Sequence, residues 1–396
     1  MPAQEHDWAV PQKLAEAVSR LSLRFTRGGD GTSADYLQED NLRRAYLAYF
    51  LPVNLAKIQA LLREMPQPGL SGTAAAPFRV LDFGAGPGTG LLAVLDWAMA
   101  VPDLVGRPLE LLAVDRSVKA LQQAEALSDL YRRQQPDVKA TVTTLKGKVP
   151  GDVTAVTTRG PFDLVILANV LNEALAGEID RVPRLAEWLA ACAALLKHDG
   201  TLMLVEPALR EASRTLHEIR NALLVQPDNP WTVFSPCLHH EPCPALAKPT
   251  DWCHEERPWQ PPAFVSVIDR SVGFIKDALK FSYLLLRKDG CTIVPRQTEF
   301  YRVVSELREM KGEKRAWLCH ETGRPEVGRL DRERSPSNEA VDHWHRGAIV
   351  RISEIVRKER KGRESTVGRI PSEATVEIIR PVRRARLTRV EQLGGG

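Results

Sequence analysis

The chain has 396 residues, 43% of them hydrophobic, and a formal net charge of +4 at pH 7. This size is long for one domain and predicts two or three modules with a large core. No apolar run reaches the ~18 residues of a membrane helix, and Met1–Trp8 lacks a basic start followed by an apolar block, so we expect neither a membrane span nor a secretory signal.

The first 75 residues are predicted to form an N-terminal helical region (1–75). Apolar side chains recur with helical spacing over residues 11–23, 41–52 and 54–62. Proline and glycine between residues 66 and 72 then indicate a loop that leads into the first strand.

Residues 76–289 alternate apolar, strand-like runs with helical segments such as residues 181–196. Nearly continuous apolar strands that alternate with helices are typical of a parallel sheet covered on both faces. The predicted parallel strands are residues 78–83, 109–115, 140–146, 162–168 and 201–206.

The most informative segment follows the first of these strands. Asp82 precedes glycines at positions 84, 86, 88 and 90, and a helical run begins at Leu91. Glycines at this spacing let the backbone turn tightly and approach a ligand at a helix N-terminus. A carboxylate there favours S-adenosylmethionine (SAM), which carries an ammonium group, over a dinucleotide, whose pyrophosphate it would repel. The segment resembles motif I of the class I methyltransferases.

A second acid suits the same cofactor. The run of residues 109–115 ends in Asp115, about one βαβ unit later, where a carboxylate can accept hydrogen bonds from both ribose hydroxyls. We therefore expect an α/β, Rossmann-like, doubly wound sheet of the class I SAM-dependent methyltransferase type. Its predicted cofactor residues are Asp82, Gly84, Gly86, Gly88, Asp115 and Asn169.

An antiparallel pair of strands, residues 251–254 and 280–287, is expected to close this sheet, with a helix near 265–279 between them. From Gly290 onward the strand-like runs are short and rich in turns, which predicts a small β-barrel-like, OB-like domain over residues 290–360. The runs are residues 291–294, 301–305, 315–320, 348–352 and 376–379.

The last residues, 361–396, are predicted to be a basic, partly disordered tail. From Arg296 to the end, Lys and Arg outnumber Asp and Glu. This excess indicates an anionic partner, with RNA as the first candidate, although a solvated charged surface gives the same pattern. The basic residues of the tail include Arg380, Arg383, Arg384, Arg386 and Arg389.

Three of the six cysteines, Cys237, Cys243 and Cys253, lie in the proline-rich residues 234–254. Thiols clustered in this way indicate a metal or cluster site, because thiolates close together repel one another unless a cation holds them. The spacing is not that of a zinc ribbon. Cys291 and Cys319 compete as the fourth ligand, whereas Cys192 lies in an apolar helix and is read as a buried structural thiol. Fallback ligands are His239, His240, His254 and His320.

Catalytic residues are not evident from the sequence. The segment after the fourth predicted strand has Asn169, Asn172 and Glu173, but it lacks the prolines and the aromatic residue with which base-nitrogen methyltransferases hold a flipped base. Asn169 can equally cap the next helix. Glu206, at the end of the fifth strand, is expected to face the same crevice. The Pro-Cys pairs that end in Cys237 and Cys243 would suit a cytosine C5 nucleophile, but a metal-bound thiolate cannot attack.

Taken in order, several segments resemble the methyltransferase-like proteins of the mitochondrial small ribosomal subunit and their bacterial relatives. The resemblance covers about residues 40–350. The matching segments are residues 80–90, 168–173, 204–216, 236–237, 242–244, 251–254, 280–284, 302–305 and 318–319.

This resemblance implies a class I methyltransferase fold, association with the small ribosomal subunit and its rRNA during assembly, and a four-cysteine iron–sulfur cluster. It favours Cys319 over Cys291, so that a [4Fe-4S] cluster, or alternatively zinc, would be held by Cys237, Cys243, Cys253 and Cys319. We expect an rRNA methyltransferase or a non-catalytic SAM- and RNA-binding assembly factor. A small-molecule methyltransferase with structural zinc is the third reading. A monomer in the bacterial cytoplasm, or in mitochondria if the source is eukaryotic, is favoured.

Overall fold

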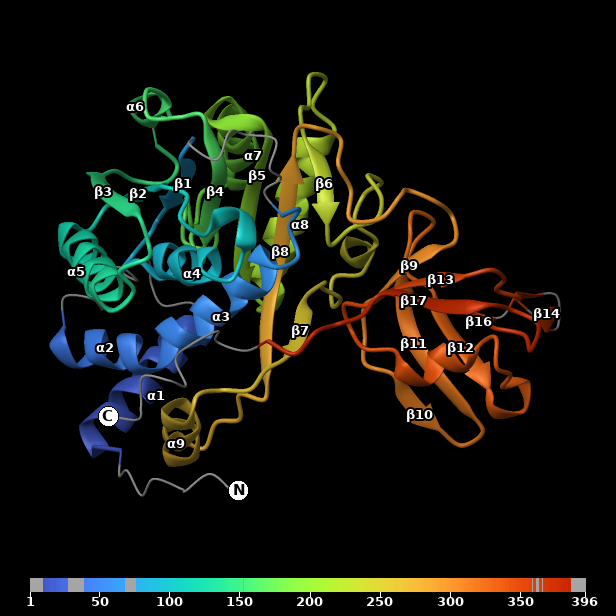
Figure 1. Ribbon diagram of the computed structural model, residues 1–396. Coiled ribbons are helices and arrows are strands. Elements are labelled where there is room, and N and C mark those ends of the chain that lie inside the picture. Colours follow the sequence, from blue (N-terminus) through green and yellow to red (C-terminus); the bar gives the residue numbers. More distant parts are fainter. Residues whose placement is uncertain are drawn as a thin grey trace.

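The computed structural model describes residues 10–27, 39–67, 76–151, 153–357, 359–360, 363–364 and 366–385. These residues build two bodies, each around its own β-sheet (Figure 1). Helices cover the first sheet on both faces, and the second sheet lies beside its antiparallel edge.

The first sheet begins with five parallel strands, which confirms all five that the sequence predicts. They pair in the order β3-β2-β1-β4-β5, and β8 (Ala278–Arg287) adds antiparallel to β5. The strands are β1 (Phe78–Phe83), β2 (Leu109–Asp115), β3 (Ala140–Lys146), β4 (Phe162–Ala168) and β5 (Leu196–Pro207).

Alternate residues of these strands enter two separate cores, as expected of a sheet that is covered on both faces. On β1, Val80 packs into one core and Leu81 into the other. The first core includes α3 (Leu51–Leu62), α4 (Thr89–Ala98) and α5 (Val118–Gln134). The second includes α7 (Arg181–Ala191) and α8 (Arg210–Leu224). Short helices η3 (Pro102–Leu104), α6 (Thr154–Thr157) and η4 (Cys192–Leu195) complete the connections.

The prediction of a sixth strand at residues 251–254 was wrong. Two short strands instead pair with β8, namely β6 (Thr232–Ser235) and β7 (Glu255–Pro258). The chain leaves the sheet after Ser235 and returns at Glu255, because the prolines in between cannot donate to a ladder. The cysteine-rich residues 236–254, with the short helix η5 (Pro244–Ala247), are thus a loop that interrupts an edge strand. The helix before β8 is α9 (Ala263–Val272), shorter than expected.

The N-terminal helices are α1 (Gln12–Arg27), α2 (Asp40–Ala45), the π-helix η2 (Tyr46–Phe50) and α3. Residues Asp40–Leu62 form one helix that is long and apolar enough to cross a membrane by length and composition. Its side chains Tyr49, Ile58 and Leu61 are buried in the first core, as in the core helix of a globular domain.

The second sheet pairs in the order β16-β12-β11-β9-β13-β17, with β10 beside β11, and has a separate core. Within the described residues this order is open, with β16 and β17 at its ends, so the expected barrel closure is not seen. A two-stranded hairpin, β14 (Glu359–Arg360) with β15 (Arg363–Glu364), projects beside it. The sheet strands are β9 (Phe300–Val303), β10 (Arg308–Met310), β11 (Glu313–Cys319), β12 (Glu326–Leu330), β13 (Ile349–Ile352), β16 (Val367–Arg369) and β17 (Val376–Arg380), and two short helices, η6 (Asp331–Glu333) and η7 (Glu339–His343), join them.

Two further expectations about this region need correction. Residues 291–294 do not form a strand, and their backbone follows β8 as a loop. Part of the predicted basic tail belongs to the second sheet: β16 lies within it, and β17 confirms the strand-like run 376–379, because Val367 and Val376 are buried in the second core. Residues 386–396, with Arg386 and Arg389, lie outside the described residues.

Candidate cofactor pocket and cysteine site

The glycine-rich loop joins β1 to α4, and its glycines serve different purposes. Gly84, Gly86 and Gly88 have φ of +69°, +53° and +89°, where other residues are strained. A Cβ on Gly84 would lie 2.4 Å from Val170 Cγ2, and one on Gly88 2.9 Å from Ala124 Cβ. A Cβ on Gly86 would meet no atom within 4 Å. Gly84 and Gly88 are therefore required for packing, whereas Gly86 faces open space.

The two predicted acids lie at the same edge of the sheet. Asp115 accepts hydrogen bonds from the N–H of Gly86 (2.9 Å) and of Ser117 (2.8 Å), so it fixes the loop as well as the start of α5. Asp82 is only 2% exposed, and its Oδ2 has no hydrogen-bond partner within the described chain. Burial, and then the charge of Asp115, raises the pKa of Asp82 to about 8. A cationic ligand group beside Asp82 would stabilise its carboxylate.

At the end of β4 the predicted polar residues bond to one another and to the backbone. Glu206 is 1% exposed and accepts the N–H groups of Val170 (3.2 Å), Leu171 (2.8 Å) and Asn172 (3.1 Å). Burial raises the pKa of Glu206 to about 8 despite these bonds. Its carboxyl group therefore holds the turn after β4 in place.

The other three candidates have distinct environments. Asn169 adopts φ of +56°, and its N–H donates to the carbonyl oxygen of Val205 (2.7 Å). The side-chain amide of Asn172 faces the carbonyl oxygen of Asn169 and the carboxyl group of Glu206. Glu173 is 39% exposed and lies 3.9 Å from Arg116. Of these residues, Glu173 has the most accessible side chain.

Sequence reasoning missed Tyr46, a residue of the π-helix η2. Its side chain is buried, and this burial is the main reason that its pKa is raised. The charges of Glu173 and Asp82 act on it as well, so the N-terminal helix borders the predicted cofactor site. Single-turn π-helices are frequent at functional sites, but no sequence pattern marks this one.

The structure brings the four favoured cysteines into one neighbourhood. Burial, followed by the charges of Cys253, Cys237 and Cys243, raises the pKa of Cys319 well above its usual value. Three of the thiols come from the loop of residues 236–254, and Cys319 ends β11 of the second sheet. Cys291, by contrast, packs against the first core. Cys192 is fully buried in the second core, as expected.

The fallback histidines have various partners. Nε2 of His239 lies 3.7 Å from Cys319 Sγ, whereas His240 contacts Arg296 and His254 contacts Glu256. His320 contacts the hydroxyl of Thr322. No three His, Cys, Asp or Glu side chains within the described ranges converge as they would on one bound ion. The cysteines are therefore grouped but not arranged as a closed single-ion site.

Two arginines of α8 hold the cysteine loop, and neither was predicted. Arg214 donates to the carbonyl oxygens of Lys248 (2.9 Å) and Asp251 (2.8 Å). Arg220 donates to those of His239 (2.7 Å) and Glu241 (2.9 Å). The loop is thus fixed to the first body through its backbone.

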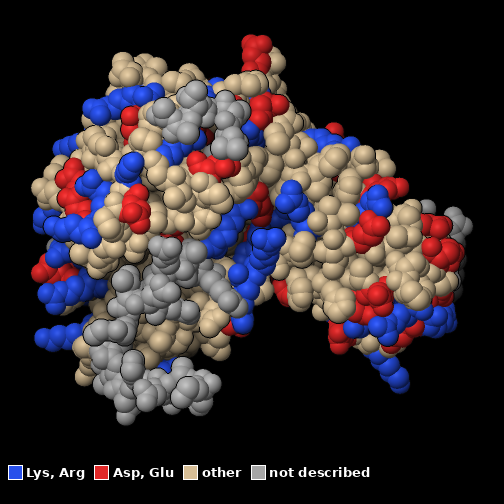
Figure 2. All heavy atoms as spheres, viewed as in Figure 1, with Lys and Arg blue, Asp and Glu red and all other residues tan. Residues whose placement is uncertain are grey.

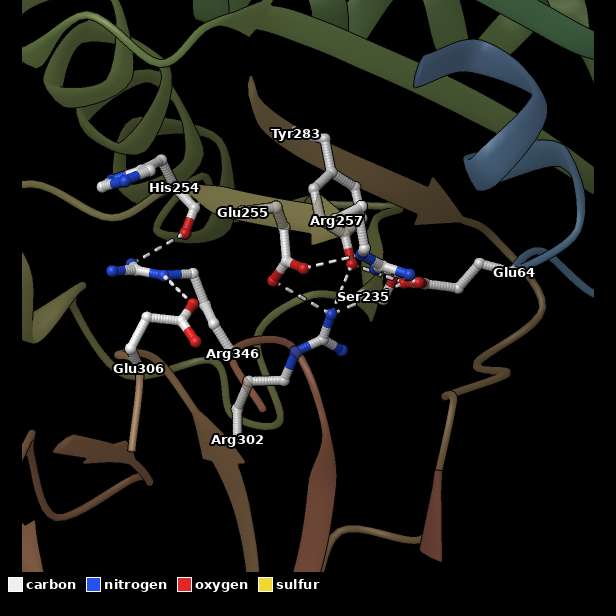
Figure 3. Close-up of polar contacts among 9 residues, drawn as sticks. All are labelled: Glu64, Ser235, His254, Glu255, Arg257, Tyr283, Arg302, Glu306 and Arg346. Carbon is white, nitrogen blue, oxygen red and sulfur yellow. Dashed lines mark hydrogen bonds and ion pairs between the residues drawn. The ribbon is translucent and has the colours of Figure 1, made fainter. Parts of the chain in front are cut away.

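A buried ionic network joins the two bodies beside this loop (Figure 3). Arg257 of β7 pairs with Glu64 (2.5 Å) and Glu255 (2.8 Å), and Arg302 of β9 pairs with Glu255 (3.2 Å). Tyr283 of β8 donates to Glu64 and accepts from Arg302 (2.8 Å). The guanidinium groups of Arg257 and Arg302, acting against burial, lower the pKa of Glu64 to about 2. Glu64 follows α3, so the network links the N-terminal helices to the second sheet.

Residues 41–329 match the sequence profile of a family described as mitochondrial small ribosomal subunit Rsm22. No functionally curated protein matches the chain in sequence. Among solved structures, the plantazolicin methyltransferase BpumL in complex with SAH shows 10% identity and a TM-score of 0.36, over 69% of this chain and 99% of that one. The arsenic(III) SAM methyltransferase CrArsM from Chlamydomonas reinhardtii shows 16% identity and a TM-score of 0.31, over 65% and 84% of the two chains. Both likenesses are distant.

Proposed function

This chain belongs to the Rsm22 family of the mitochondrial small ribosomal subunit, and from this premise we infer that it is a SAM-binding, methyltransferase-like protein that acts in the assembly of that subunit. The observation that carries the cofactor proposal concerns the residues at the end of β1. There the backbone of Gly86 faces open space, and Asp82 at the end of the strand is a buried acid whose Oδ2 lacks a partner in the described chain. An ammonium or sulfonium group supplies the missing positive charge.

The cofactor proposal predicts a specific loss of SAM binding. Gly86→Arg places a long side chain in the open space and should abolish binding, as measured by calorimetry with SAM or its demethylated product. Asp82→Asn should weaken binding by about 10- to 100-fold, the effect of losing a charge-assisted hydrogen bond.

Gly106→Arg is the matched control for Gly86→Arg. Gly106 also has a positive φ (+76°), and a Cβ there also meets no atom within 4 Å, but it precedes β2 at the opposite end of the sheet. Gly106→Arg should leave SAM affinity unchanged. Equal losses in the two arginine variants would contradict the proposed site.

The turn after β4 supports a binding role over methyl transfer. Glu206 and Asn172 bond to the turn itself, and the segment contains no aromatic residue to stack a flipped base. We propose that SAM binding stabilises an assembly factor that contacts immature rRNA. Mapping of methylated nucleotides in small-subunit rRNA, with and without the protein, tests this. A nucleotide whose methylation requires both the protein and Asp82 would establish the catalytic reading instead.

The RNA-binding part of the proposal concerns the junction of the two bodies. On the face shown in Figure 2, Lys and Arg gather in the notch between the bodies, whereas on the second body they alternate with Asp and Glu. Many basic side chains of the second body form ion pairs with acidic ones, for example Arg329 with Asp342 and Arg369 with Glu313. The excess of basic residues toward the C-terminus is therefore partly neutralised there, and the notch is the better candidate for a phosphate backbone.

We also propose that the four grouped cysteines hold a [4Fe-4S] cluster. Such a cluster takes its four thiolates on separate iron atoms, so its ligands surround a volume and do not converge on one point. The mutual electrostatic influence of the four thiols supports this proposal, and zinc is the alternative occupant. When bound, the cluster would join the loop of the first body to β11 of the second. In a eukaryote we place the protein in mitochondria, and in a bacterium in the cytoplasm.

A further inference from the structure

Arg220 of α8 is a buried cation without a carboxylate partner in the described parts of the chain. Among the described residues, five arginines are less than 9% exposed, and Arg220 is the most deeply buried of them, at 0%. The other four each pair with an acid: Arg257 with Glu64, Arg287 with Asp289, Arg302 with Glu255, and Arg329 with Asp342.

The hydrogen bonds of Arg220 go to neutral acceptors. Its two terminal nitrogens donate to Asn221 Oδ1 (2.8 Å) and to the carbonyl oxygens of Glu241 (2.9 Å) and His239 (2.7 Å). Its Nε has no partner within the described residues. Carbonyl dipoles satisfy N–H groups but do not balance a full charge, and an unbalanced charge in the interior costs several kcal/mol. A negative group is therefore missing from this part of the interior.

The cysteine loop packs against Arg220, because two of the hydrogen-bond acceptors of Arg220 are carbonyl oxygens of that loop. Asn221 Oδ1 accepts from Arg220 (2.8 Å) and from the N–H of Cys243 (3.1 Å), and the charge of Arg220 acts on both Cys237 and Cys243. As neutral thiols these groups do not compensate a guanidinium. As thiolates bound to a metal centre they do, because four thiolates together exceed the positive charge of the metal core.

We propose that Arg220 is the buried counter-charge of an anionic, thiolate-ligated centre held by Cys237, Cys243, Cys253 and Cys319. The inference rests on the proposed cluster and deepens it. Arg220 acts as a positioning residue, since it fixes the loop through its carbonyl oxygens and stabilises the negative charge of the centre. Because reduction adds a further negative charge, Arg220 also raises the reduction potential of the centre.

The first test compares Arg220→Met with Arg220→Lys in full-length protein purified without oxygen. Arg220→Met should release iron to a chelator about 10-fold faster or more, as found when partners of metal ligands are removed. In a redox titration followed by electron paramagnetic resonance, its remaining cluster should have a more negative potential. Arg220→Lys keeps the charge and should recover most of the potential. A merely structural role would not move the potential.

The second test separates charge compensation from loop packing. Arg220→Met is made in two backgrounds: the wild-type protein, which carries the cluster, and a variant with serine at all four cysteines, which cannot. In each background, the thermal unfolding midpoint is compared with and without Arg220→Met. The lost hydrogen bonds to His239 and Glu241 cost the same in both backgrounds. The counter-charge is lost only in the loaded protein, so the midpoint should fall further there. Arg329→Met is the control, and its effect should be equal in both backgrounds because Asp342 is always present.

The outcomes distinguish the two proposals. If wild-type protein purified without oxygen contains no iron and sulfide, the proposed cluster is wrong, and the inference about Arg220 is wrong with it. A loaded wild type whose Arg220→Met variant keeps the same potential and iron retention, with the same midpoint loss in both backgrounds, would overturn the role of Arg220 alone.

Discussion

Cys319→Ser is expected to remove the iron and sulfide that the wild-type protein binds and to lower the unfolding midpoint sharply. The free energy of structural metal binding is also folding free energy, and it reaches on the order of 10 kcal/mol in small zinc proteins. Here the ligands come from two bodies, so loss of Cys319 should also loosen the second sheet from the first. Iron and sulfide analysis, visible absorption and thermal unfolding of protein prepared without oxygen measure these effects.

Cys291→Ser is the matched control, because the sequence leaves both cysteines open as the fourth ligand. Cys291 follows β8 and packs against the first core, whereas Cys319 is influenced by the charges of the three loop cysteines. The Cys291→Ser protein should keep its full iron content and midpoint. If Cys319→Ser stays loaded while Cys291→Ser does not, the fourth ligand has been assigned to the wrong cysteine.

The second large effect is expected for Glu64→Gln, which removes one acid from the buried network between the bodies. Arg257 then keeps only Glu255, and Tyr283 loses its charged acceptor. Breaking a buried ion pair in this way costs about 3–5 kcal/mol. Denaturant unfolding at pH 7 measures this loss. Glu110→Gln, which removes the half-exposed pair with Arg79, should change stability by no more than about 0.5 kcal/mol.

The effect of Glu64→Gln should also depend on pH. The pKa of Glu64 is lowered from 4.5 to about 2 in the folded protein, so the folded state favours the ionised form. This contribution, on the order of 3 kcal/mol, is complete above about pH 4.5 and is lost as the pH falls toward about 2. The difference in unfolding free energy between wild type and variant should therefore shrink over this range. A difference that stays constant down to pH 2.5 would show that the charge of Glu64 is not what stabilises the junction.

Local sequence patterns predicted the parallel half of the first sheet and the glycine-rich loop. The five strands are long apolar runs, and the positive φ values of Gly84, Gly86 and Gly88 follow from residue type and spacing. The sixth strand was placed wrongly because β6 and β7 have only four residues each and are separated by a proline-rich loop. Neither piece has the length or the alternation from which a strand is recognised.

Local sequence patterns could not predict the roles of Glu206, Tyr46 and Arg220. The bonds of Glu206 reach 34–36 residues back along the chain, and the effect of Arg220 depends on a loop about 20 residues away. The same residues in another fold would have other partners. The grouping of Cys319 with the loop cysteines was expected only from the family resemblance, because nothing in their spacing places β11 beside residues 236–254.

The sequence by itself determined the parallel sheet, the glycine-rich turn with its two acids and the family to which the chain belongs, because each is recorded in neighbouring residues or in the order of short segments. Only the tertiary structure decided which glycine faces open space, which acid holds the turn after β4, and which buried arginine has no carboxylate in the described chain. These properties are sums over contacts between segments distant in sequence. Burial and charge balance are set by what packs against a residue, so they exist only once the chain has folded.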